Sequence, residues 1–124
     1  MKFARYTFLG AAVWGLLVLL PQFFLESRVA AETPPAITHP EFYYGFLGVA
    51  TAFQLVFLVV AFDPSAFRVL IPIAIVEKLG FAVPAIILYL SGRMAAGGFF
   101  IGAITDLLLA ALFTVSMVKV ARST

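Results

Sequence analysis

Three ionisable residues, Glu77, Lys78 and Asp106, lie within long apolar stretches of the sequence. An ionisable side chain in the hydrocarbon of a membrane costs about 2.5–3.5 kcal/mol on insertion scales and is a functional hypothesis by default. One lysine cannot fully neutralise two carboxylates, and a carboxyl group without a counter-ion in low dielectric keeps its proton more readily. These residue types therefore predict a buried site that binds a polar group or relays protons.

Counting along the apolar stretches places these side chains at nearly one depth. With a rise of about 1.5 Å per residue, Glu77 and Lys78 lie roughly 12–14 Å from the start of their stretch. Asp106 enters from the opposite side, which leaves an axial gap of about 6 Å to Lys78 that a lysine can bridge. Gln54 and Trp14 come to the same level on two other stretches. The candidate ligand-binding or proton-relay residues are Glu77, Lys78, Asp106, Gln54 and Trp14, with Thr51 and Thr105 within one turn.

A purely structural role for the same residues stays open. Buried polar groups in helix bundles also fix the register between helices without binding any ligand. Glu77 and Lys78 are neighbours in the sequence and point about 100° apart on a helix, so they need not pair with each other.

Several chemistries are excluded by the residues that the chain lacks. It has no cysteine, which removes thiol redox chemistry, thiolate metal sites and iron–sulfur clusters. The single histidine, His39, lies in a polar segment, so a bis-histidine haem site between helices is excluded. His39, Glu32 and Glu41 could in principle contact a metal ion, but we interpret them as side chains of a solvated loop. We expect no metal site and no cofactor, and no nucleotide-binding or hydrolase motif is present.

The composition identifies the environment of these residues. The chain has 124 residues, of which 64% are hydrophobic and 11% are charged, whereas soluble domains carry about 25% charged residues. So few charges cannot cover the apolar surface in water, and the chain is predicted to lie in a lipid bilayer as one domain over residues 1–124. Its positive charges are scattered, so no nucleic-acid partner is expected.

Four apolar runs are each long enough to cross about 30 Å of hydrocarbon as a helix. They cover residues 6–25, 42–62, 69–90 and 99–118, and none alternates with the period of a β-strand. The sequence therefore predicts an all-α integral membrane four-helix bundle with up-down-up-down topology. The intervening segments, the longest being 26–41, are predicted to be polar loops.

Some helix ends can be predicted. Thr38 and Glu41 match a capping box that would open the second helix. Asp63-Pro64 matches an N-cap followed by proline, which would open the third helix before Val69. Pro72 and Pro84 would then lie inside the third helix and kink it.

The distribution of basic residues predicts the orientation. Cytoplasmic flanks carry the excess of lysine and arginine, and both termini are therefore predicted to be cytoplasmic. On that assignment the cytoplasmic set is Lys2, Arg5, Arg68, Lys119 and Arg122, against Arg28 and Arg93 on the other side. An alternative interpretation of the first apolar run is a signal peptide that is cleaved near Val29-Ala30-Ala31.

Small and aromatic residues indicate packing and membrane boundaries. Gly10, Ala11 and Gly15 recur at helical spacing in the first run, which favours close helix packing. Tyr43 and Tyr44 at the start of the second run fit an aromatic belt at the outer boundary.

The scattered polar residues also resemble a known family. The segment His39-Pro40-Glu41-Phe42-Tyr43-Tyr44-Gly45-Phe46, with Gln54, Asp63-Pro64, Glu77-Lys78 and Asp106, is similar to small uncharacterised bacterial four-helix membrane proteins of DoxX-like type. The resemblance implies a multi-pass protein of the bacterial inner membrane, and it carries no established reaction.

Three functions are consistent with these residues. In the first, the polar cluster binds a small amphipathic ligand, such as a lipid or quinone head group, or relays protons. In the second, the chain is an accessory or structural subunit of a larger membrane complex, and the cluster only sets helix register. Self-association into a homo-oligomer stays open as a separate expectation about its partners. In the third, Glu77 and Asp106 act as paired carboxylates of an intramembrane isomerase.

Overall fold

The computed structural model describes residues 1–123, and all regular elements in that range are helical. The prediction of an all-α protein is confirmed. The elements are α1 (Lys2–Leu19), η1 (Leu20–Phe24), α2 (Glu26–Glu32), α3 (Pro40–Phe62), η2 (Arg68–Leu70), α4 (Ile71–Leu90) and α5 (Gly98–Ser123).

Four helical segments are long and apolar enough to cross a membrane, as the sequence predicts. They cover Lys2–Phe24, Pro40–Phe62, Arg68–Leu90 and Gly98–Ser123. Large apolar side chains remain exposed along each of them, for example Leu17, Phe62, Val76 and Leu108. In water such a surface would be unstable, whereas in lipid it meets a solvent of its own polarity.

The first span differs from its predicted form at its far end. The α-helix ends at Leu19, and a 3-10 helix over Leu20–Phe24 completes the span, because Pro21 has no N–H to continue the α-helical pattern. The following segment was predicted to be a loop throughout, and this is wrong for Glu26–Glu32, which form the short helix α2.

The predicted caps also do not open the next two helices. Helix α3 begins at Pro40 behind His39, without a side-chain cap hydrogen bond. Asp63 accepts a hydrogen bond from the backbone N–H of Ala66 at 3.1 Å, which closes a turn and does not start α4. Because α4 begins only at Ile71, Pro72 lies in its first turn and Pro84 is the proline inside the helix.

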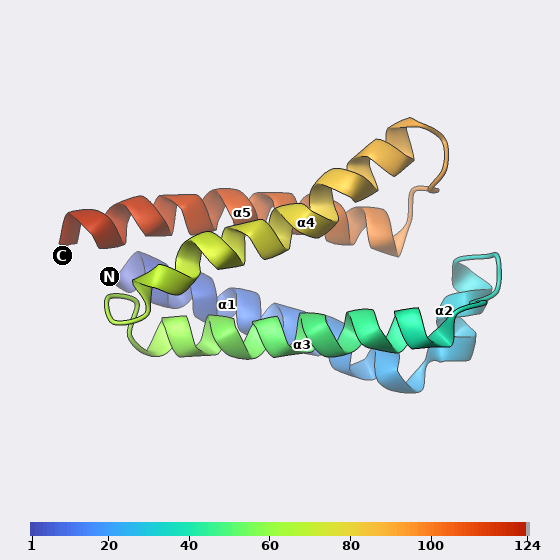
Figure 1. Cartoon of the computed structure of the whole chain (residues 1–124), viewed down its shortest axis with the longest axis horizontal. Helices are drawn as coiled ribbons and strands as arrows, with labels where there is room; N and C mark the ends of the chain where they lie inside the picture. Colours follow the sequence, from blue (N-terminus) through green and yellow to red (C-terminus); the bar gives the residue numbers. More distant parts are fainter. Residues whose placement is uncertain (124) are drawn as a thin grey trace.

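The long helices pack as two pairs. Helix α1 packs mainly on α3 and α4 mainly on α5, while contacts between α1 and α5 join the two pairs. Helices α3 and α4 touch little, and Figure 1 shows α4 bending away from α3 along its second half. Pro84 accounts for a bend there, because it cannot donate a hydrogen bond to the carbonyl of Gly80. Both termini lie at one end of the molecule, and α2 lies at the other (Figure 1).

All four long helices share a core only in the half nearest the termini. Phe8 of α1 stacks on Phe113 of α5 with ring centroids 4.1 Å apart, and Phe57 of α3 meets Phe113 edge-on at 5.1 Å. Ile71 of α4 completes this cluster. Toward the other end a separate small cluster joins Leu19 to α3 alone. Helices α3 and α4 therefore share buried core residues in this half, and the second small cluster contains no residue of α4.

Candidate functional site

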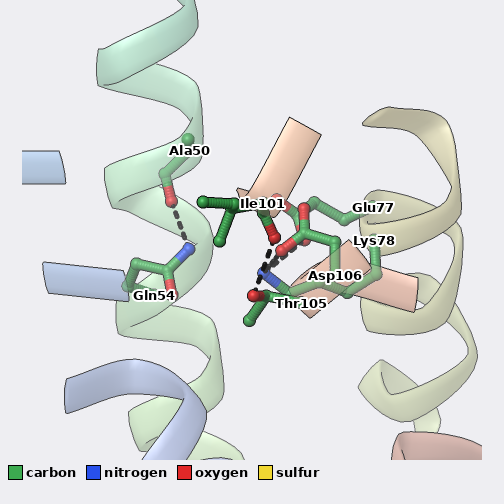
Figure 2. A network of polar contacts seen from close by, with 7 residues as sticks. All are labelled: Ala50, Gln54, Glu77, Lys78, Ile101, Thr105 and Asp106. Atoms are coloured by element: carbon green, nitrogen blue, oxygen red, sulfur yellow. Dashed lines mark hydrogen bonds and ion pairs between the residues drawn. The ribbon is translucent and has the colours of Figure 1, made fainter. Parts of the chain in front are cut away.

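Lys78 binds both carboxylates that the sequence places at its depth. Its Nζ lies 3.2 Å from Oδ1 of Asp106, to which it donates a hydrogen bond, and 3.6 Å from Oε2 of Glu77. The side chains of Lys78, Glu77 and Asp106 are 6%, 17% and 19% exposed. Figure 2 shows the three side chains converging from α4 and α5. We call these residues the triad.

The positions of the triad follow from helix pairing. Glu77 and Lys78 lie in the middle of α4, and Asp106 lies on α5, the helix that packs most extensively on α4. The predicted reach of Lys78 to Asp106 is thus present in the structure. The adjacent residues Glu77 and Lys78, which the sequence did not require to pair, do form an ion pair, because the lysine is long enough to place its ammonium beside both carboxylates.

Lys78 of the triad contacts the cluster of packed rings formed by Phe8, Phe57 and Phe113, which we call the aromatic core. The Nζ of Lys78 lies 5.1 Å from the centroid of the Phe57 ring, within the range of a cation–π interaction. Phe57 in turn packs against Phe8 and Phe113. The ammonium is therefore held between two carboxylates and an aromatic face, at the point where the four-helix core ends.

The triad has more negative than positive charge, and one of its buried oxygens has no hydrogen bond. Two carboxylates face one ammonium, so the fully ionised triad has a net charge of −1, and one bound proton would make it neutral. Oε2 of Glu77 is buried and has no hydrogen-bond partner within residues 1–123. A buried acceptor whose only polar contact is the 3.6 Å ion pair with Lys78, with no hydrogen bond, is costly, and it can accept a hydrogen bond from a proton-bearing ligand group.

Gln54 lies across from the triad but forms no hydrogen bond with it. Its side chain is buried on α3, and Nε2 donates a hydrogen bond to the carbonyl of Ala50 at 2.9 Å (Figure 2). Its amide packs directly against Gly15 of α1, in space that any Cβ at that position would occupy. Oε1 of Gln54 and Oγ1 of Thr51 are both buried without a hydrogen-bond partner within residues 1–123.

Two other side chains assigned to this layer point elsewhere. Trp14 is 50% exposed on α1, so its side chain lies on the outer face of the bundle and not in the buried layer. Thr105 donates its hydroxyl hydrogen bond to the carbonyl of Ile101, one turn back on its own helix (Figure 2). The triad therefore comes from α4 and α5, with Phe57 of α3 in contact with Lys78, and helix α1 adds no side chain to it.

Sequence reasoning missed two features of this region. The first is the aromatic face under Lys78, which depends on how α3 is rotated toward α4. The second is the contact between Gly15 and Gln54. The glycines and alanine of the first span indicated close packing, and Gln54 indicated a buried amide, but nothing in the sequence links the two positions. Within residues 1–123, no group of three or more His, Cys, Asp or Glu side chains could hold a metal ion.

Comparison with protein-family models, with curated proteins and with solved structures finds no match to this chain.

Proposed function

We propose that the chain is a multi-pass protein of a bacterial inner membrane, related to the DoxX-like proteins, with four spans in alternating directions and cytoplasmic termini. Four apolar helices of sufficient length support the multi-pass assignment. Both termini lie at the same end of the molecule, which agrees with the orientation that the excess of basic residues favours.

We expect single cysteines to report this orientation cleanly, because the chain has no cysteine of its own. Ala66→Cys, in the segment between α3 and α4, should stay unlabelled by a membrane-impermeant maleimide in intact cells and become labelled after lysis. Ser91→Cys, at the end of α4, should be labelled in intact cells. The reverse pattern would contradict cytoplasmic termini, and partial labelling of both would indicate dual topology.

We further propose that the triad is a proton-holding site that hydrogen-bonds the head group of a small amphipathic ligand. The observation that carries this proposal is the pairing of one buried ammonium with two carboxylates, of which Glu77 keeps a buried oxygen without a hydrogen bond. Asp106 accepts the shorter contact and acts as the counter-ion of Lys78. Glu77 then holds the proton or accepts a hydrogen bond from a ligand hydroxyl or amine.

The loose packing between α3 and α4 supports access from the lipid. Helices α3 and α4 make few contacts with each other, and the carboxylates of the triad are partly exposed. The ring centroids of Phe46 on α3 and Phe81 on α4 are 6.0 Å apart and link the two helices. An amphipathic molecule whose polar group reaches the triad would leave its apolar part among such rings and the lipid.

Infrared spectroscopy tests the bound proton. The purified protein at neutral pH should show the C=O stretch of a protonated carboxyl group, with the expected shift in deuterium oxide. Glu77→Gln and Asp106→Asn should each remove this band, because the remaining carboxylate then balances Lys78. Glu41→Gln, which alters an exposed carboxylate paired with His39, should leave the band unchanged.

Mass spectrometry of extracted lipids tests ligand binding in the same variants. A molecule retained by the native protein and by Glu41→Gln should be lost from Glu77→Gln and Asp106→Asn.

Each measurement has an outcome that contradicts its part of the proposal. Absence of the infrared band from the native protein, or its persistence in Glu77→Gln, would contradict proton storage. Equal retention in all four proteins would contradict the ligand and leave register-setting as the function of the triad.

A further inference from the structure

A second polar region lies far from the triad, at the end of the molecule opposite the termini. An open hollow of about 420 Å³ lies between η1, the start of α2 and the first turns of α3. The side chains that define it are Phe23, Phe24, Glu26, Arg28 and Tyr44. The lining of the hollow thus includes three aromatic rings, one carboxylate and one guanidinium group.

Glu26 is the half-buried anion of this hollow. Its Oε1 accepts a hydrogen bond from the hydroxyl of Tyr44 at 2.9 Å, which fixes the carboxylate toward the rings. Within residues 1–123 no lysine, arginine or histidine forms an ion pair with Glu26. The carboxylate is therefore oriented by the protein but has no counter-ion.

Arg28 is already partly neutralised. Its Nε donates a hydrogen bond to Oε1 of Glu32 at 3.0 Å, one turn along α2. A guanidinium group has five N–H donors, so donors remain for a second acceptor such as a phosphate oxygen. With Glu32 balancing Arg28, the charge left over in the hollow is negative and belongs to Glu26.

The aromatic rings suit a cation. The ring centroids of Phe23 and Tyr44 are 6.3 Å apart, and the Phe24 side chain is 87% exposed beside them. Aromatic faces next to a carboxylate attract ammonium groups through cation–π and ionic interactions together. The hollow lies where the apolar span Lys2–Phe24 ends and Pro40–Phe62 begins, so it lies at the level of lipid head groups.

We propose that this hollow binds the head group of a zwitterionic phospholipid. The ammonium lies against Glu26 and the rings of Phe23 and Tyr44, and the phosphate accepts hydrogen bonds from the remaining donors of Arg28. The acyl chains pass over Phe24 into the bilayer. This site is independent of the triad and requires no reaction.

Native mass spectrometry of the full chain from nanodiscs with equal amounts of phosphatidylethanolamine and phosphatidylglycerol tests the proposal. The native protein should retain phosphatidylethanolamine preferentially. Glu26→Gln should lower the ratio of retained phosphatidylethanolamine to phosphatidylglycerol about tenfold, which corresponds to one charge-assisted contact. The matched control is Glu41→Gln in the first turn of α3, which removes an exposed carboxylate that does not line the hollow and should leave the preference for phosphatidylethanolamine unchanged.

One further variant and two competitors show which parts of the hollow and of the lipid produce the preference. Tyr44→Phe keeps the ring and removes the hydrogen bond, so the preference should weaken less than in Glu26→Gln. Phosphatidylcholine, whose ammonium is fully methylated, should compete with phosphatidylethanolamine, whereas free tetramethylammonium at equal concentration should not, because it lacks the phosphate and the acyl chains. Equal helicity of all variants by circular dichroism shows that they fold. A preference for phosphatidylglycerol in the native protein, an equal loss in Glu41→Gln, or displacement by tetramethylammonium would overturn the proposal.

Discussion

Replacing Lys78 by methionine is expected to destabilise the folded bundle by about 3–5 kcal/mol, the range for removing one partner of a buried ion pair. Methionine nearly matches the length of lysine, so the change removes the charge more than the volume. Glu77 and Asp106 then face each other across the α4–α5 contact without the ammonium that lies 3.6 Å and 3.2 Å from them. The contact of Nζ with the Phe57 ring is also lost.

The free energy of unfolding in mixed detergent micelles, followed by far-ultraviolet circular dichroism, measures this cost. Lys119→Met is the matched control, because Lys119 is exposed and its Nζ also lies over an aromatic ring, that of Phe3, at 5.4 Å. We expect the control to change the stability by less than about 1 kcal/mol.

A triple variant separates charge imbalance from lost packing. Glu77→Gln and Asp106→Asn added to Lys78→Met remove both uncompensated carboxylates, and at least half of the lost stability should return. If Lys78→Met is as stable as the native protein, the ion pairs carry no net stability. If the triple variant is no better than Lys78→Met, the lost stability comes from packing and not from charge.

Replacing Gly15 by alanine is expected to cost about 1–3 kcal/mol, the usual range for overpacking a close contact. The new methyl group would occupy the position of the Gln54 amide. Although Gln54 has a flexible side chain, it is only 1% exposed and its Nε2 is bonded to the carbonyl of Ala50. Moving the amide therefore breaks a buried hydrogen bond or separates α1 from α3.

Gly10→Ala on the same helix is the control, because a Cβ at Gly10 would meet no atom within 4 Å. Alanine is the better helix former by about 1 kcal/mol, so this variant should be as stable as the native protein or more stable. The same unfolding experiment measures both variants.

The double variant Gly15→Ala with Gln54→Ala tests the contact itself. Removing the amide makes room for the methyl group, so the double variant should lose less stability than the sum of its two single changes. Additive costs would show that Gly15 and Gln54 do not interact. An unchanged stability in Gly15→Ala alone would show that Gln54 moves aside freely.

Much of the fold could be predicted because it depends on the length of each apolar run and on the fixed rise of the helix, which can both be read from the sequence. The four spans follow from runs of apolar residues, and the structure keeps all four. The alignment of Lys78 with Asp106 follows from the fixed rise of the helix, which converts sequence distance into depth. The residues that cap each helix were harder to predict than the spans. Thr38 caps no helix, and the capping hydrogen bond of Asp63 forms as expected but closes a single turn ahead of α4.

The sequence by itself determined the helical class, the four apolar helices of membrane-spanning length and the axial level of each polar residue along its helix, since composition and helical rise need no knowledge of the neighbouring helices. Only the tertiary structure decided which of those residues meet. Trp14 and Gln54 lie at similar depths, yet one is exposed and the other packs against Gly15. Rotation about each helix axis and the choice of partner helix depend on side-chain packing between all four spans, which the sequence pattern of one span does not contain.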